Sequence, residues 1–153
     1  MLKPAEEAPD FTLPRDGGED VTLSGLRPAP VVLFFYPKDD TSGCTKEAIA
    51  FTGLAGEFEA AGAKVFGISK DTVAKHDKFR DKHELGIPLL SDAESDVCER
   101  YGVWKEKSMY GKKFMGIERT TVLIGGDGKV VQVWPKVKVP GHAEEVLEAV
   151  KAL

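Results

Sequence analysis

Short apolar runs separated by turn residues predict the strands of this chain. The longest run, Val31 to Tyr36, is continuous and rich in β-branched and aromatic residues, which favours a strand buried on both faces of a sheet. An N-terminal hairpin is expected where 10–14 and 21–23 flank Gly17-Gly18. Asp127-Gly128 between two apolar runs predicts a second hairpin. The other expected strands are 64–69, 88–91, 120–124 and 130–134.

Apolar positions at helical spacing predict the helices. Five positions recur at steps of four and three and form one helix face: Cys44, Ala48, Phe51, Ala55 and Phe58. This helix is expected to start at Thr41 or Ser42 and to stop at Gly62. Further helices are expected at 72–85, at about 94–101 and at about 143–152. The stretch 103–116 is polar and rich in Lys and Gly, which indicates a loop or an irregular hairpin.

The order of these elements indicates an α/β fold. Strands alternate with helices before a hairpin and a closing helix, which is typical of one central mixed sheet flanked by helices. The order contains that of a thioredoxin-like fold, with an added N-terminal β-hairpin and a further addition in the middle. No repeat or linker interrupts the chain, so we expect a single domain over residues 1–153.

The composition and net charge argue against a nucleic-acid or membrane partner. The chain is 42% hydrophobic and 30% charged, and its net charge is −4. Nucleic-acid and membrane-surface proteins usually carry a basic excess, so neither partner is expected. The apolar run 30–36 is too short to cross a bilayer, which takes ~20 residues, and the N-terminus lacks the apolar run of a secretory signal. We therefore expect a cytoplasmic protein.

The two cysteines, Cys44 and Cys98, leave few chemical roles open. Two cysteines supply neither a disulfide scaffold nor a four-cysteine zinc site. Cys44 falls in the first turn of a helix that follows a buried strand, where free N–H groups and the helix dipole stabilise a thiolate over a thiol. Position alone is equally compatible with a core thiol on the apolar helix face.

The segment FFYPKDDTSGCTKEA shifts that balance. Its Pro37, Thr41 and Cys44, in the spacing PxxxTxxC, resemble the active-site signature of the peroxiredoxins, and more narrowly of the Q-type, or bacterioferritin comigratory protein, subfamily. The likeness runs along nearly the whole chain, through APDFTLP, PLLSD, YGVWKEKSMYGKKFMGIERTTVLI and DGKV. It implies a thioredoxin-like fold and a thiol peroxidase that needs no metal and no bound cofactor.

The resemblance also implies a role for each site residue. Cys44 would attack hydrogen peroxide or an alkyl hydroperoxide and become a sulfenic acid. Thr41 would form a hydrogen bond with the peroxide, and Pro37 would shield the sulfur. Arg119 would stabilise the thiolate and polarise the leaving oxygen. Glu47 is interpreted as an ordinary first-turn carboxylate rather than a catalytic group.

One departure from the subfamily concerns the resolving cysteine. Q-type members place it five residues after the peroxidatic cysteine, which here is Ile49, or in the following long helix, which here has none. Cys98 is expected to be a buried core thiol. The prediction is therefore a one-cysteine mechanism, in which thioredoxin, or glutaredoxin with glutathione, reduces the sulfenic acid on Cys44.

Alternatives to this reading remain open. In one alternative, the enzyme uses a two-cysteine cycle with Cys98 as an unusual resolving thiol. In the other, the protein is a peroxide sensor or holdase whose Cys44 becomes oxidised without efficient turnover. A thiol-disulfide oxidoreductase is disfavoured because Cys44 lacks a Cys-x-x-Cys partner. His76 and His83 share a helix face two turns apart, but no metal site is expected there. Like many Q-type relatives, the chain is expected to be a monomer.

Overall fold

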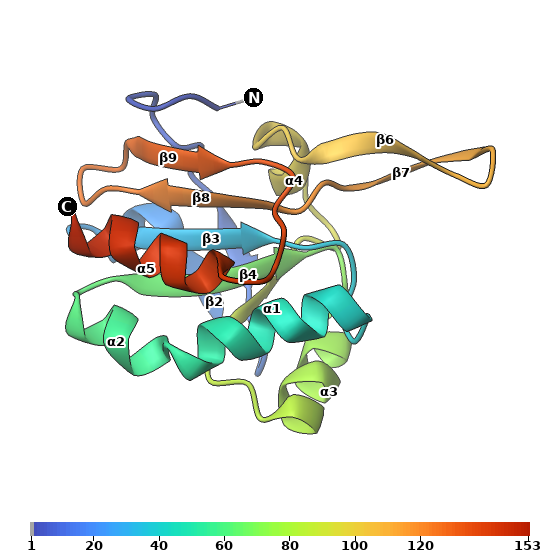
Figure 1. Cartoon of the computed structure of the whole chain (residues 1–153), viewed down its shortest axis with the longest axis horizontal. Coiled ribbons are helices and arrows are strands. Elements are labelled where there is room, and N and C mark those ends of the chain that lie inside the picture. Colours follow the sequence, from blue (N-terminus) through green and yellow to red (C-terminus); the bar gives the residue numbers. More distant parts are fainter. Residues whose placement is uncertain (1) are drawn as a thin grey trace.

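A computed structural model describes residues 2–153, and its centre is a five-stranded mixed sheet with the strand order β5-β4-β3-β8-β9 (Figure 1). Strands β3, β4 and β5 run parallel, whereas β8 and β9 pair antiparallel, β8 next to β3. The predicted mixed sheet is therefore confirmed. The strands are β3 (Val31–Phe35), β4 (Lys64–Ser69), β5 (Leu89–Ser91), β8 (Thr120–Ile124) and β9 (Val130–Trp134).

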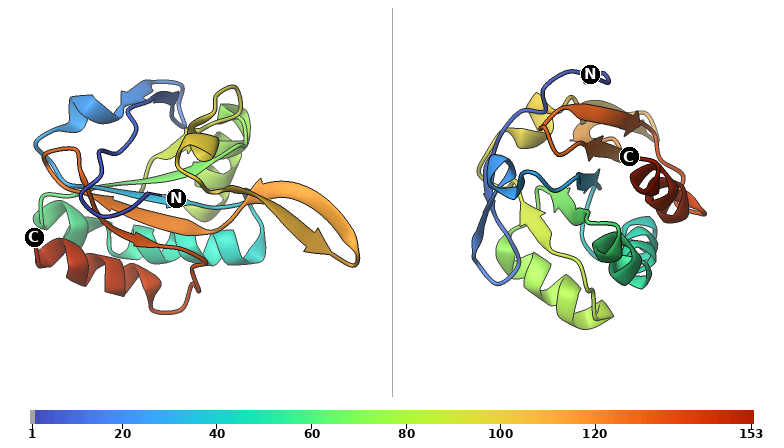
Figure 2. Two further views of the ribbon diagram at one scale, coloured as in Figure 1. Left: turned by 90° about the horizontal axis from the view of Figure 1, so that it is seen from above. Right: turned by 90° about the vertical axis from the view of Figure 1, so that its left-hand side faces the viewer.

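Helices cover the sheet unequally on its two faces (Figure 2). One face carries four helices: α1 (Ser42–Gly53), α2 (Ala55–Ala60), α3 (Val73–His83) and α5 (His142–Lys151). The other face carries the predicted N-terminal hairpin and two short helices: β1 (Thr12–Pro14), β2 (Asp20–Thr22), η1 (Leu23–Leu26) and α4 (Val97–Arg100). The α/β class is thus confirmed.

Strand β3 separates two hydrophobic clusters, because successive side chains of a strand point to opposite faces. Val31, Leu33 and Phe35 pack into the cluster beneath the N-terminal hairpin and α4. Val32 and Phe34 pack into the cluster beneath the four longer helices. All five are buried, which explains why this strand is a continuous apolar run rather than an alternating one.

Two elements differ from the sequence prediction. The helix expected to continue to Gly62 is interrupted at Leu54, between α1 and α2, where Gly53 and Gly56 weaken helix formation. The stretch expected to be a loop or irregular hairpin forms a regular hairpin of β6 (Trp104–Met109) and β7 (Lys112–Ile117), which projects from the body of the molecule (Figure 1). Tyr110 and Gly111 both have positive φ, as a two-residue hairpin turn requires.

The loop between β3 and α1 is attached to helix α3 by a buried polar chain. His76 Nδ1 lies 2.6 Å from Asp39 Oδ2, and His76 Nε2 donates to the carbonyl of Leu90 at 2.9 Å. The hydroxyl of Tyr36 donates to the other oxygen of Asp39 at 2.6 Å. Burial lowers the pKa of His76, but the bonds to Asp39 outweigh it and raise that pKa overall. The buried imidazole therefore holds the loop through two hydrogen bonds, and its raised pKa favours the protonated form, in which its contact with Asp39 is an ion pair.

Replacing the buried imidazole should destabilise the protein in a pH-dependent way. His76→Leu leaves Asp39 buried without its partner, and we expect the free energy of unfolding to fall by about 3–5 kcal/mol near pH 6. The pKa of folded His76 is raised above its unfolded value of about 6.5, so the pair stabilises fully below that pH and less as the pH rises through the folded-state pKa. Urea denaturation across a pH series measures this.

His83→Leu is the matched control, since His83 pairs with the exposed carboxylate of Asp40. Its effect should stay within about 1 kcal/mol. A deficit for His76→Leu that is the same at every pH would contradict an ion-paired imidazole.

Candidate active site

The pairing of β3 with β8 brings distant residues to one edge of the sheet. The strands are antiparallel, with Phe35 opposite Thr120, so β8 begins where β3 ends. The chain leaving β3 leads into α1, whose first turn contains Cys44. Arg119 immediately precedes β8 and therefore meets that first turn, although it lies 75 residues from Cys44 in sequence.

Arg119 bridges two side chains of helix α1. Its Nη2 donates to the sulfur of Cys44 at 3.4 Å, and its Nη1 donates to Oε1 of Glu47 at 2.8 Å. Cys44 and Glu47 are three residues apart on one helix face, and each is only 1% exposed. The planar guanidinium presents its donors in a fixed fork, so one arginine can serve both groups.

Glu47 belongs to this network, contrary to the sequence interpretation of an ordinary first-turn carboxylate. Burial raises its pKa to about 7, and the Arg119 charge opposes that rise only in part. The signal available in the sequence was spacing. Position 47 lies three residues after Cys44 and four before Phe51, inside the buried stripe of the helix.

Gly43 allows Arg119 to approach the helix terminus. A Cβ at position 43 would lie 3.0 Å from Arg119 Nη2, closer than ordinary packing allows. The amides of Gly43 and Cys44 fall in the first turn, where N–H groups have no partner inside the helix. The site therefore gathers the sulfur, one guanidinium and free N–H donors, a setting suited to an anion.

The remaining two predicted residues lie in the loop that connects β3 to this site. Thr41 stands just before α1, and its hydroxyl donates to the carbonyl of Lys38 at 2.8 Å. Within residues 2–153, no hydrogen bond joins Thr41 to Cys44. Pro37 is half-buried two residues after the end of β3. The structure thus brings Cys44 and Arg119 into contact and places Thr41 and Pro37 in the adjoining loop.

Cys98 lies in a different environment from Cys44. It sits on α4 in the cluster beneath the N-terminal hairpin, whereas Cys44 belongs to the cluster on the opposite face of the sheet. Its expected burial is confirmed, at 0% exposure. Burial and the neighbouring carboxylate of Asp92 raise the pKa of the Cys98 thiol strongly. A buried thiol with a raised pKa carries little of the reactive thiolate form.

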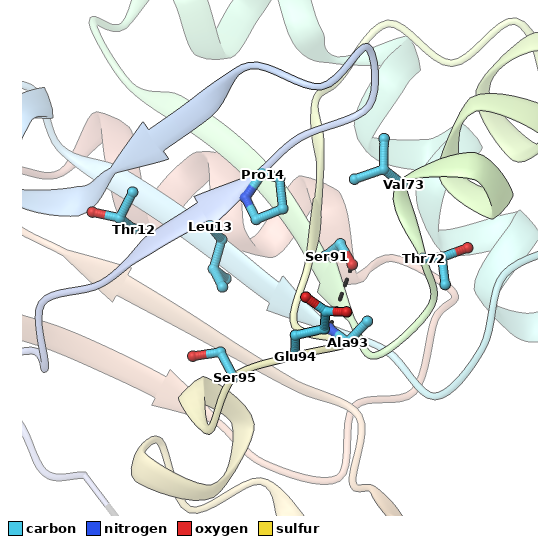
Figure 3. A pocket seen from close by; sticks show the side chains of 9 residues that line it. All are labelled: Thr12, Leu13, Pro14, Thr72, Val73, Ser91, Ala93, Glu94 and Ser95. Carbon is cyan, nitrogen blue, oxygen red and sulfur yellow. Dashed lines mark hydrogen bonds between the residues drawn. The ribbon is translucent and has the colours of Figure 1, made fainter.

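A pocket of about 480 Å³ opens away from this site, beside β1 and the start of α3 (Figure 3). None of the residues around Cys44 lines it. Three of its hydroxyl side chains already form hydrogen bonds within the protein: Thr12, Thr72 and Ser91. The pocket therefore offers few free polar groups to a ligand.

Over residues 2–153, no group of three or more His, Cys, Asp or Glu side chains is placed to hold a metal ion. The helices in that range lack the length and apolarity that a bilayer crossing requires.

Comparisons with known proteins assign the family. The model of the AhpC/TSA family matches residues 4–133. Peroxiredoxin Bcp of Xanthomonas campestris is 48% identical over 143 residues, which cover 94% of this chain and 89% of the relative. A solved structure of the bacterioferritin comigratory protein of Xanthomonas campestris matches with a TM-score of 0.91 at 45% identity, covering 98% of each chain. A PrxQ structure from Xylella fastidiosa matches with a TM-score of 0.94 at 40% identity, covering 99% of this chain and 97% of its own.

These neighbours confirm the predicted thioredoxin-like fold and the resemblance to the Q-type peroxiredoxins. The chain therefore belongs to the AhpC/TSA family and, within it, to the Bcp or Q-type peroxiredoxins, which are thiol-dependent peroxidases.

Proposed function

We propose that this peroxiredoxin reduces hydrogen peroxide and organic hydroperoxides by a one-cysteine cycle at Cys44. The observation that carries the proposal is the 3.4 Å contact between Arg119 Nη2 and the Cys44 sulfur at a helix N-terminus. A fixed positive charge beside the sulfur favours the nucleophilic thiolate. The Xanthomonas campestris relative, whose reported activity is alkyl peroxide reduction, supports the organic hydroperoxides as substrates.

The chemistry balances around the sulfur. The Cys44 thiolate attacks one peroxide oxygen, so an S–O bond forms while the O–O bond breaks. The sulfur is oxidised to a sulfenic acid, and the leaving oxygen takes a proton to become water or an alcohol. Negative charge spreads over two oxygens during this step, and the Arg119 guanidinium and the amides of Gly43 and Cys44 stand ready to stabilise it.

Thr41 and Pro37 complete the proposed pocket. The Thr41 hydroxyl donates its proton to Lys38, so its oxygen is left to accept a hydrogen bond from the O–H of a hydroperoxide. Such a bond would orient the peroxide for attack by Cys44 one turn further on. Pro37 is proposed to shield the sulfur from bulk water at the start of the same loop.

The positions of the two cysteines support a one-cysteine cycle. Cys98 is buried on the far face of the sheet, so a Cys44–Cys98 disulfide would require both helices to leave their clusters. Ile49 occupies one usual resolving position and is half-exposed on α1. Helix α3 contains no cysteine. The sulfenic acid on Cys44 therefore depends on a thiol from outside the chain.

The external reductant is proposed to be thioredoxin, or glutaredoxin with glutathione. These thiols operate in a reducing compartment, so the proposal places the protein in the cytoplasm. We further propose that the chain works as a monomer and as one domain over residues 1–153, since both the Cys44 and the Arg119 of the site come from the same chain.

The first test follows the two thiols through one oxidation. With one equivalent of hydrogen peroxide and a trapping reagent, mass spectrometry should find a sulfenic acid on Cys44 and a free thiol on Cys98. Cys44→Ser should lose peroxide consumption entirely, and Cys98→Ser should keep it nearly unchanged, because only the first change removes the nucleophile.

Other outcomes of this test would point to the alternatives. A Cys44–Cys98 disulfide in the monomer would establish a two-cysteine cycle. Complete oxidation of Cys44 without turnover, whether thioredoxin, glutaredoxin or glutathione is supplied, would establish a peroxide sensor or holdase instead of an enzyme.

A second test removes the positive charge at the sulfur. Arg119→Met should slow sulfenic acid formation on Cys44 by about 10²–10³-fold, because a preorganised donor to the developing charge is lost. Rapid-mixing fluorescence of the two tryptophans, checked by mass spectrometry, measures this rate. Arg100→Met, which removes an exposed arginine paired with Asp96, is the matched control and should oxidise at the normal rate. Equal rates in the two variants would exclude the proposed role of Arg119.

A further inference from the structure

In the active site, Arg119 contacts two groups that can be negative. Arg119 reaches the Cys44 sulfur with one nitrogen and the Glu47 carboxyl with the other, and both partners are 1% exposed. A thiolate and a carboxylate together would place two negative charges beside one positive charge, away from water. Like charges in a poorly solvated site disfavour joint ionisation. While Cys44 is a thiolate, Glu47 is therefore favoured in its neutral form.

The second oxygen of Glu47 supports the same protonation state. Two side-chain oxygens in residues 2–153 are buried without a hydrogen bond, Oε2 of Glu47 and Oε2 of Glu118. The oxygen of Glu118 has the ammonium of Lys105 at 3.3 Å, whereas that of Glu47 has no ion-pair partner in the described chain. An ionised oxygen buried in this way is costly. A protonated carboxyl group removes that charge.

The neighbouring elements bring no second cation to Glu47. His142, at the start of α5, has its pKa lowered by burial and by the charge of Arg119. Lys107, on β6, has its pKa lowered by burial and by the charge of Arg119, an effect that Cys44 and Glu118 oppose only in part. Arg119 is the one cation within ion-pair distance of Glu47 among residues 2–153. The protonation state of Glu47 therefore depends on whether the Cys44 sulfur, the other group that Arg119 contacts, carries a negative charge.

We propose that Glu47 holds a proton while Cys44 is a thiolate and releases it when Cys44 becomes a sulfenic acid. The inference rests on the peroxidase cycle proposed above. In this proposal, Glu47 supplies the proton that the leaving oxygen takes up. Cys44 and Glu47 then carry the negative charge beside Arg119 in turn.

The cycle closes in atoms and charge. The Cys44 thiolate, the hydroperoxide and the Glu47 acid become a sulfenic acid, an alcohol or water, and a Glu47 carboxylate. An external thiol then attacks the sulfenic sulfur, which releases water and leaves a mixed disulfide. A second thiol displaces Cys44 as a thiolate and releases a proton, which returns to Glu47. Arg119 faces one full negative charge at both ends of the cycle.

Infrared difference spectroscopy detects the protonated carboxyl directly. When one equivalent of peroxide is added near pH 6, the carbonyl band of a carboxylic acid should disappear and a carboxylate band should appear. Protein carrying ¹³C-labelled glutamate should shift both bands, which assigns them to a Glu side chain in the unaltered protein. Mass spectrometry of the same sample counts the sulfenic acid on Cys44.

Three variants serve as comparisons. Glu47→Gln should lose the band change and should slow sulfenic acid formation about 10²-fold, as expected when a positioned acid is removed. Glu118→Gln, the matched control one residue from Arg119, should keep both the band change and the rate. Cys44→Ser should show no band change, because no oxidation occurs.

The outcomes separate the two proposals. Full conversion of Cys44 to sulfenic acid without loss of a carboxylic acid band would overturn the role of Glu47 and leave the peroxidase proposal intact. Failure of Cys44 to form a sulfenic acid would overturn the peroxidase proposal itself. If the carboxylic acid band disappears on peroxide addition in Glu47→Gln as much as in the unaltered protein, another residue supplies the proton and the inference is contradicted.

Discussion

The antiparallel register of β3 and β8 is the constraint on which the candidate active site depends. With Phe35 opposite Thr120, the residue before β8 lies beside the loop that leaves β3. A slip of one residue would turn every side chain of β8 to the other face of the sheet and carry Arg119 away from helix α1. Register is strongly specified here because β3 and β8 are buried along their whole length, so no slipped pairing keeps both clusters filled.

The same arrangement concentrates charge where solvent cannot screen it. Burying a guanidinium with its acidic partners contributes little to stability, and often less than apolar packing of the same volume would. The stability of the fold therefore comes from the two hydrophobic clusters on either side of the sheet. The Arg119–Glu47 contact is held in place by this packing, which fits the role in chemistry that we propose for it rather than a role in stability.

Elements with a buried face could be predicted from the sequence. Strand β3, the buried stripe of α1 and the β8–β9 hairpin each carry a local signal in their apolar spacing or their turn residues. For the β6–β7 hairpin the sequence indicated only a loop or an irregular hairpin, because most of its side chains face solvent and show no alternation. The break at Leu54 was missed because the apolar stripe continues across it.

The candidate site could be predicted only in part from the sequence. Cys44 is marked by its place at a helix start, but its contact with Arg119 spans 75 residues and entered the prediction through family resemblance alone. The sequence indicated an ordinary first-turn carboxylate at Glu47 and, at His76, only a histidine on the same helix face as His83 with no metal site expected. Their burial depends on Arg119 and Asp39, partners that lie far away in sequence and that no periodicity reveals.

The burial of the Cys44 sulfur affects how the peroxide and the reductant each reach it. The Cys44 side chain is only 1% exposed. A peroxide molecule is small enough to reach its sulfur more readily than the bulky active site of a protein reductant. The loop above it is tied to α3 through Asp39 and His76, so wide opening has to break an ion pair. In the proposed cycle, access to the sulfur therefore matters as well as its intrinsic reactivity. In the proposed cycle, a small peroxide reaches the sulfur by diffusion, whereas a protein reductant reaches it only when the protein exposes Cys44.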